Sequence, residues 1–106
     1  MAVGGIGTSI RELAERYAAV LRREMTLSGL YVYGSYARGS ADGDSDIDIA
    51  VISDNFTGDR IEDMLWLMKL RRKVDTRIEP RPFRLAEFCD QDPLAREIIN
   101  TGVQII

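Results

Sequence analysis

The segment DIDIAVI, residues 46–52, alternates two aspartates with isoleucines and then becomes wholly apolar. Side chains on a β-strand point alternately to the two faces of a sheet, so a strand here would bury its three odd-numbered apolar residues on one face. Asp46 and Asp48 then share the other face, about 7 Å apart along the backbone. Because neighbouring carboxylates repel each other and lose hydration when buried, the segment predicts a strand that carries a site for a cation.

Carboxylate oxygens are hard ligands, which favours magnesium or manganese as that cation. We expect a third acid from residues 74–79, VDTRIE, predicted to be a further strand that presents Asp75, Arg77 and Glu79 on one face. Asp75 is preferred because it begins this predicted strand with no competing partner visible in the sequence. Glu79, which abuts Pro80 at the predicted exit of the strand, is the alternative. Arg77 is expected to neutralise or orient a neighbouring aspartate.

The segment YGSYARG, residues 33–39, is expected to contact a phosphate-bearing ligand. It takes the chain from a short strand through Gly34 and Ser35 into a helical turn. Backbone N–H groups at such a corner bind phosphate oxygens, and glycine lets the backbone approach closely. Ser35 adds a hydroxyl donor, and Arg38 lies one turn further on. Phosphate binding beside a two-cation carboxylate site is suited to attack on an α-phosphate.

Two simpler interpretations compete for the aspartates. A calcium-binding EF-hand loop would begin at Asp42, but its sixth position is Ile47 where glycine is required, and its twelfth is Ser53 where glutamate is required. A solvated hairpin loop accounts well for Asp42 and Asp44. It does not account for the two aspartates inside the strand.

The rest of the chain has the periodicities of a mixed fold. In the second predicted helix, Ile61, Met64, Leu65 and Met68 are expected to face the core, and Ser9 with Glu12 forms a possible capping box at the start of the first. We therefore predict an α/β (α+β) domain with a mixed sheet of about four strands and helices packed against it. The predicted helices are 8–25, 59–72 and 93–100, and the predicted strands are 30–33, 47–52, 74–79 and 103–106.

Composition limits the classes of function. With 106 residues, 45% of them hydrophobic, the chain fits one domain, 1–106, whose first seven residues we expect to be flexible. No apolar run is long enough to cross a membrane and no signal peptide is evident, so a cytoplasmic location is expected. Without histidine, Cys89 has no partner for Cys-His chemistry. A net charge of −3 argues against direct binding to nucleic acid.

Gly34-Ser35, ten intervening residues, and then Asp46-Ile47-Asp48 match the pattern GS-x(10)-D-x-D. The chain thereby resembles the nucleotidyltransferase superfamily that includes DNA polymerase β. Its size is similar to that of the minimal nucleotidyltransferases (MNT proteins). The resemblance extends through the predicted strand at 74–79 to the closing residues 97–106, and so covers most of the chain.

The resemblance implies an activity and a set of site residues. Asp46 and Asp48 would hold two Mg²⁺ ions, and Asp75 would help to hold one and accept the proton of the nucleophile. The turn at Gly34 and Ser35 would hold ATP or another nucleoside triphosphate. The implied reaction transfers a nucleoside monophosphate, AMP from ATP, to a hydroxyl group and releases pyrophosphate.

The resemblance also implies a partner. Larger members carry a helical domain that binds the acceptor, and none is present in these 106 residues. Minimal members are often paired with a HEPN-type protein, and some act as antitoxins by attaching AMP to a HEPN toxin. Two alternatives are a non-catalytic module that silences its partner by binding, and a small-molecule nucleotidyltransferase that acts as a homodimer or other homo-oligomer.

Overall fold

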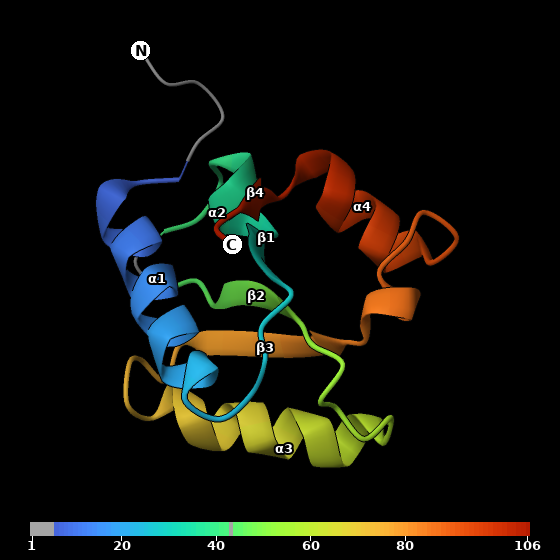
Figure 1. Ribbon diagram of the computed structural model, residues 1–106. Helices are drawn as coiled ribbons and strands as arrows, with labels where there is room; N and C mark the ends of the chain where they lie inside the picture. The colour runs from blue at the N-terminus through green and yellow to red at the C-terminus, as the bar shows by residue number, and fades with distance from the viewer. Residues whose placement is uncertain (1–5, 43) are drawn as a thin grey trace.

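A computed structural model describes residues 6–42 and 44–106, so most of the predicted flexible start, 1–7, lies outside the described residues. Helices and strands follow the predicted order, and the helical turn expected after the first strand is present as a short helix (Figure 1). A 3-10 turn after the third strand was not predicted. The elements are α1 Thr8–Arg22, β1 Gly29–Tyr33, α2 Ser35–Arg38, β2 Ile47–Ile52, α3 Arg60–Arg71, β3 Ile78–Phe83, η1 Leu85–Glu87, α4 Pro93–Thr101 and β4 Val103–Gln104.

The four strands form one mixed sheet in the order β3-β2-β1-β4. β1 runs antiparallel to both β2 and β4, whereas β2 and β3 are parallel. The parallel pair requires a crossover, and α3 provides it. This arrangement confirms the predicted α/β (α+β) fold with a four-stranded mixed sheet.

Each face of the sheet has its own core. Ile47, Ile49 and Val51 pack with α1 and α3 in the larger cluster, which includes the completely buried Tyr17 and Leu67. On the other face, Ala50 and Ile52 pack with α4 in a smaller cluster. In Figure 1, α1 and α3 lie along the left and lower sides of the molecule and α4 lies at the upper right. Because Asp48 alternates with Ile47 and Ile49, it belongs to the α4 face.

The predicted third strand was misplaced. Residues 74–79 were expected to form it, but β3 is Ile78–Phe83 and runs through Pro80 and Pro82. The sheet order makes β3 an edge strand. Backbone bonds from Ile47 N to Arg77 O and from Ser53 N to Phe83 O show that the odd-numbered residues of this segment face β2. Both prolines therefore turn their missing N–H toward the open edge, where no partner strand needs it.

The predicted inner face of α3 was also wrong. Ile61 and Leu65, expected in the core, are 73% and 61% exposed, and the two methionines of that set are only half-buried. The core contacts of α3 come instead from Leu67 and Leu70. The helix has apolar residues on two sides, one with Ile61 and Leu65 and the other with Leu67 and Leu70, and the prediction assigned the first side to the core.

The start of α1 lacks a side-chain cap. Gly7 is the N-cap residue of α1 and no side chain caps the helix, so the capping box expected from Ser9 and Glu12 is absent. Within the described residues, no helix combines the length and apolar character needed to span a bilayer.

Candidate active site

Asp48 lies at the centre of the candidate site. It is the second residue of β2, and Asp46 precedes the strand by one residue. In the sheet, Asp48 is the register partner of Tyr33 on one side and of Glu79 on the other. Register partners on neighbouring strands point to the same face, so the Glu79 side chain lies beside that of Asp48. We refer to Asp46, Asp48 and Glu79 together as the carboxylate site.

The electrostatics of Asp48 reflect this crowding of acids. Partial burial raises the pKa of the Asp48 carboxyl above its ordinary value, and the negative charges of Asp46 and Glu79 raise it further. Arg38 and Arg81 act in the opposite direction and lower it. The carboxylate site therefore concentrates negative charge that the surrounding arginines only partly offset.

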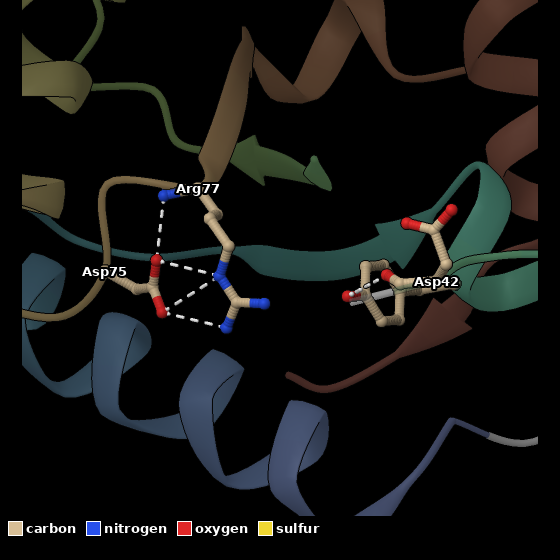
Figure 2. A network of polar contacts seen from close by, with 4 residues as sticks. Asp42, Asp75 and Arg77 are labelled. Carbon is tan, nitrogen blue, oxygen red and sulfur yellow. Dashed lines mark hydrogen bonds and ion pairs between the residues drawn. The ribbon is translucent and has the colours of Figure 1, made fainter. Parts of the chain in front are cut away.

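Asp75, the preferred third acid, has a different environment. It lies in the turn before β3, and its carboxylate accepts hydrogen bonds from the Arg77 backbone N at 2.8 Å and from Arg77 Nη2 at 3.0 Å (Figure 2). These bonds lower the pKa of the Asp75 carboxyl, with a smaller contribution from Arg16 of α1. We refer to this pair as the Asp75–Arg77 turn. The structure thus pairs Asp75 with Arg77 and brings Glu79, the alternative acid, next to Asp48.

The carboxylate site supplies only oxygen donors to a cation. Among residues 6–42 and 44–106, no three acidic or sulfur-bearing side chains already stand close enough to hold a metal ion. Asp46 and Glu79 are exposed, however, and their charges already reach Asp48. Exposed carboxylates can rotate toward a bound cation, which would remove their mutual repulsion. The donors of the carboxylate site thus fit Mg²⁺ or Mn²⁺.

The Gly34 turn lies against the carboxylate site. Gly34 has φ 74° and ψ −145°, a backbone conformation that glycine alone adopts readily. A Cβ atom added at this position would collide with the Asp48 carboxylate. The close approach of the turn to Asp48 is therefore possible only because residue 34 lacks a side chain.

The two other predicted phosphate-binding residues follow in α2. Ser35 is the first residue of this helix, and its carbonyl accepts a bond from Ser40 N at 2.9 Å. Arg38, the last residue, is exposed and close enough to lower the pKa of Asp48. Its backbone N–H bonds to Gly34 O at 3.0 Å, so the amides before it start the helix, where no intrahelical acceptor exists for them. Gly34 and Arg38 thus lie near Asp48, and Ser35 begins the short helix between them.

Asp42 and Asp44 lie in the loop that precedes β2. Asp42 Oδ1 accepts bonds from Asp44 N at 2.9 Å and from Ser45 Oγ at 3.3 Å. The Asp42 carbonyl accepts a bond from the Tyr36 hydroxyl at 3.0 Å, which is the dashed line beside Asp42 in Figure 2. Asp42 and Asp44 are both exposed. These contacts match the solvated loop that the sequence allowed for these two aspartates.

Sequence reasoning missed two residues around Asp48. Arg81 follows Glu79 by two positions on β3 and therefore shares its face, and it lowers the pKa of both Asp48 and Tyr33. Burial raises the pKa of the Tyr33 hydroxyl. The alternation of Glu79, Arg81 and Phe83 with the two prolines was the available signal, and it was overlooked because proline was taken to end the strand.

A cleft of about 410 Å³ begins at Arg81 and continues away from the carboxylate site. Its lining includes Arg60 and Arg84 as well as three acids. The acids are already occupied by backbone groups: Asp63 accepts bonds from Thr57 and Gly58, Asp92 caps α4, and Glu87 accepts a bond from Arg84 N. Of the arginines that line the cleft, Arg81 is the one that lies near Asp48, and Arg84 already donates a bond from Nε to Phe56 O at 3.2 Å.

Comparisons with known proteins concern the family and the fold of the chain. The family model described as "Polymerase beta, Nucleotidyltransferase" matches residues 15–106. No curated protein matches the chain.

Three solved structures share the fold at low sequence identity. The crystal structure of a putative nucleotidyltransferase from Sulfolobus solfataricus is 21% identical, with a TM-score of 0.63 over 91% of this chain and 78% of that chain. A toxin–antitoxin structure with AMP-PNP is 23% identical, with a TM-score of 0.60 over 88% of this chain and 72% of that one. A tri-AMPylated Shewanella oneidensis HEPN toxin in complex with MNT antitoxin gives 22% identity and a TM-score of 0.62 over 92% and 71%.

Proposed function

The chain belongs to the polymerase beta nucleotidyltransferase family, and we propose that it transfers AMP from ATP to a hydroxyl group on a partner protein, with release of pyrophosphate. The observation that carries this proposal is the position of Asp48. It shares a sheet face with a second and a third acid, and it lies against a glycine turn that approaches within contact distance of its carboxylate.

We propose that Asp46 and Asp48 hold the divalent cations. Glu79 is the better supported third acid because it is the register partner of Asp48. Its Oε2 lies 3.9 Å from Arg71 Nη1, a longer contact than the 3.0 Å bond that joins the Asp75 carboxylate to Arg77. Bound Mg²⁺ ions would lower the pKa of the attacking hydroxyl and neutralise charge that develops on the leaving pyrophosphate. The Glu79 carboxylate would accept the proton of that hydroxyl.

The arginines around the carboxylate site would bind and orient the phosphates. In our proposal, the N–H groups that follow Gly34 and the side chains of Ser35 and Arg38 contact the triphosphate. Arg81, on the other side of Asp48, offers a guanidinium at the start of the cleft. Guanidinium groups bind phosphate or carboxylate oxygens in a planar, two-point geometry. We also propose that the acceptor segment reaches the site through this cleft, because the cleft is open at Arg81, next to Asp48.

A HEPN-type toxin is our proposed acceptor. Support comes from the shared fold with proteins from toxin–antitoxin complexes, one of which contains a tri-AMPylated HEPN toxin with its MNT antitoxin. The transfer would place AMP on a hydroxyl of the partner and so change its activity. No nucleic acid is required for this reaction.

The test is a transfer assay with ATP labelled on the α-phosphate, Mg²⁺ and a candidate HEPN protein. We expect label on the acceptor and one pyrophosphate released for each label attached. ATP labelled on the γ-phosphate is the matched control and should leave the acceptor unlabelled. Failure to bind ATP, together with no transfer to any acceptor, would contradict the proposal.

A second candidate function is silencing by complex formation without chemistry. It is favoured by the lack of a preformed three-ligand group within the described residues. Replacing both Asp46 and Asp48 by Asn separates the two functions. If the variant still silences the partner, binding is sufficient; if silencing is lost while the complex persists, transfer is required.

A further inference from the structure

The outer face of α3 carries an apolar ridge. Ile61 and Leu65, one turn apart, are 73% and 61% exposed, and the half-buried Met64 and Met68 border them. The inner side of the same helix already packs on the core through Leu67 and Leu70. The ridge is therefore not needed for the packing of this chain, and water is a poor environment for it.

Charges of opposite sign lie beside this ridge. Glu62 and Lys69 are exposed and seven residues apart, which places them on the same flank of the helix, two turns from each other. Neither forms an ion pair with any residue in 6–42 or 44–106. The flank is thus acidic near the start of α3 and basic near its end, with Leu65 about midway between the two charges.

We propose that this face of α3 is a homodimer interface, formed by two copies of the chain with their α3 helices antiparallel about a twofold axis near Leu65. In a twofold contact the same surface is used by both copies and must complement itself. The antiparallel arrangement places Glu62 of one copy beside Lys69 of the other, twice by symmetry. A parallel arrangement would place the Glu62–Lys69 flanks of the two copies on opposite sides of the contact, so these pairs would not form.

The antiparallel arrangement has further support from α3 itself. It opposes the dipoles of the two helices, which favours the pair over a parallel one. It also brings the Ile61 end of one apolar ridge against the Met68 end of the other, so large side chains meet along the whole contact. A contact between two single helices is small for a specific interface, so we expect dissociation at about micromolar concentrations.

The dimer would leave the candidate active site open. α3 packs on the sheet face of Ile49, whereas Asp48 and Glu79 belong to the opposite face, which α4 covers in part. Dimer formation therefore does not depend on the proposed function, and the two can fail separately.

The experiment is sedimentation velocity over a concentration series with the wild-type chain and charge-swap variants. Glu62→Lys and Lys69→Glu should each weaken the dimer by about tenfold or more, because each creates two like-charge contacts. The double variant Glu62→Lys/Lys69→Glu should restore most of the affinity. Circular dichroism and the thermal unfolding midpoint of each variant establish that the fold is retained.

Leu65→Asp should leave the protein monomeric at every concentration. Leu85→Asp is the matched control, because Leu85 is a similarly exposed leucine, 55% accessible, away from α3. A wild-type chain that is monomeric up to about a hundred times the micromolar range expected for a small interface would overturn the proposal. So would a dimer unaffected by Leu65→Asp, or a double charge swap that restores nothing. A monomer that binds a HEPN protein through Leu65 would assign this face to that partner instead.

Discussion

Glu79 of the carboxylate site follows Asp75 of the Asp75–Arg77 turn by only four residues, yet the acids at these two places have different environments. Asp48 lies among other acids, and its pKa is raised by burial and by the charges of its neighbours. Asp75 lies against Arg77, and its pKa is lowered by the hydrogen bonds between them. The charge of Asp75 is neutralised by hydrogen bonds within its turn, whereas the charge of Asp48 is only partly offset by Arg38 and Arg81. We therefore propose a structural role for Asp75 and a cation-binding role for Asp48.

The largest effect is expected from Asp48→Asn. Losing the central ligand should lower AMP transfer by about 1,000-fold, the upper range for loss of one group that stabilises transition-state charge. Asp46→Asn should act in the same direction. The measurement is initial rate with α-labelled ATP at saturating acceptor.

Asp44→Asn is the matched control for these variants, because Asp44 is an exposed loop acid outside the carboxylate site. Its transfer rate should remain within about twofold of wild type, given the small effect of typical surface substitutions. Equal losses of transfer in the Asp44 and Asp48 variants would contradict the proposal that Asp48 is the central cation ligand.

Gly34→Ala should be the most destabilising single change at the carboxylate site. The Cβ would collide with the Asp48 carboxylate, and φ 74° with ψ −145° is unfavourable for alanine. We expect a loss of about 3 kcal/mol in the free energy of unfolding. Urea denaturation provides the measurement.

Gly39→Ala gives the cost of a positive φ without a collision, because Gly39 has φ 77° with ψ 15°, a left-handed conformation that alanine tolerates better than that of Gly34, and a Cβ added there would meet no atom within 4 Å. It should lose only about 1–2 kcal/mol. Adding Asp48→Ala to Gly34→Ala should recover the part that is due to crowding. Equal losses at both glycines would show that Asp48 contributes nothing.

Glu79→Gln and Asp75→Asn compare the two acids directly. The Glu79 change should lower transfer by about 10–100-fold with little change in stability. The Asp75 change should lower the free energy of unfolding by about 0.5–1.5 kcal/mol, the usual contribution of a hydrogen bond, with transfer largely retained. Transfer rates and urea denaturation of the same preparations test both. The reverse result, with Asp75 required for transfer, would restore the expectation drawn from the sequence.

The smallest effects concern the pH dependence of stability. The folded-state pKa of Asp48 is raised, so its ionisation destabilises the fold at neutral pH; Asp48→Asn should be more stable than wild type at pH 7, and the difference should vanish below the ordinary pKa of 3.8. The folded-state pKa of Asp75 is lowered, so Asp75 stabilises the fold above 3.8 and this contribution is lost as the pH falls further.

Urea denaturation at pH 7 and at about pH 3, below the ordinary carboxyl range, measures both signs in one experiment. Metal-free buffer is required, since a bound cation would reverse the effect of Asp48. Two variants that shift stability in the same direction would contradict the contrast between the two acids.

Much of the fold could be read from local patterns. β2 was predicted at its observed bounds, because alternation of acids with Ile is unmistakable when only one face of a strand is apolar. The first helix was also predicted close to its observed range, and its buried residues Leu13, Tyr17 and Leu21 recur at helical spacing. The family signature depends on short-range spacing, and it was confirmed by the family match over residues 15–106.

The errors share a physical origin. Whether proline ends a strand depends on which side of that strand has a neighbour, and the sequence of 78–83 does not contain this information. Which of two apolar stripes on α3 faces inward likewise depends on the position of the sheet. Both depend on contacts between segments that are distant in the chain.

The sequence by itself determined the order of the main helices and strands, the bounds of β2 and the two aspartates that alternate with its apolar residues, because these follow from backbone periodicity and short-range spacing. Only the tertiary structure decided which third acid stands beside Asp48 and which apolar surface of α3 remains outside. The register of β2 and β3 pairs Glu79 with Asp48, whereas the Asp75 carboxylate is hydrogen-bonded to Arg77 within a local turn. Pairing across a sheet is a long-range property, and no spacing within a single segment specifies it.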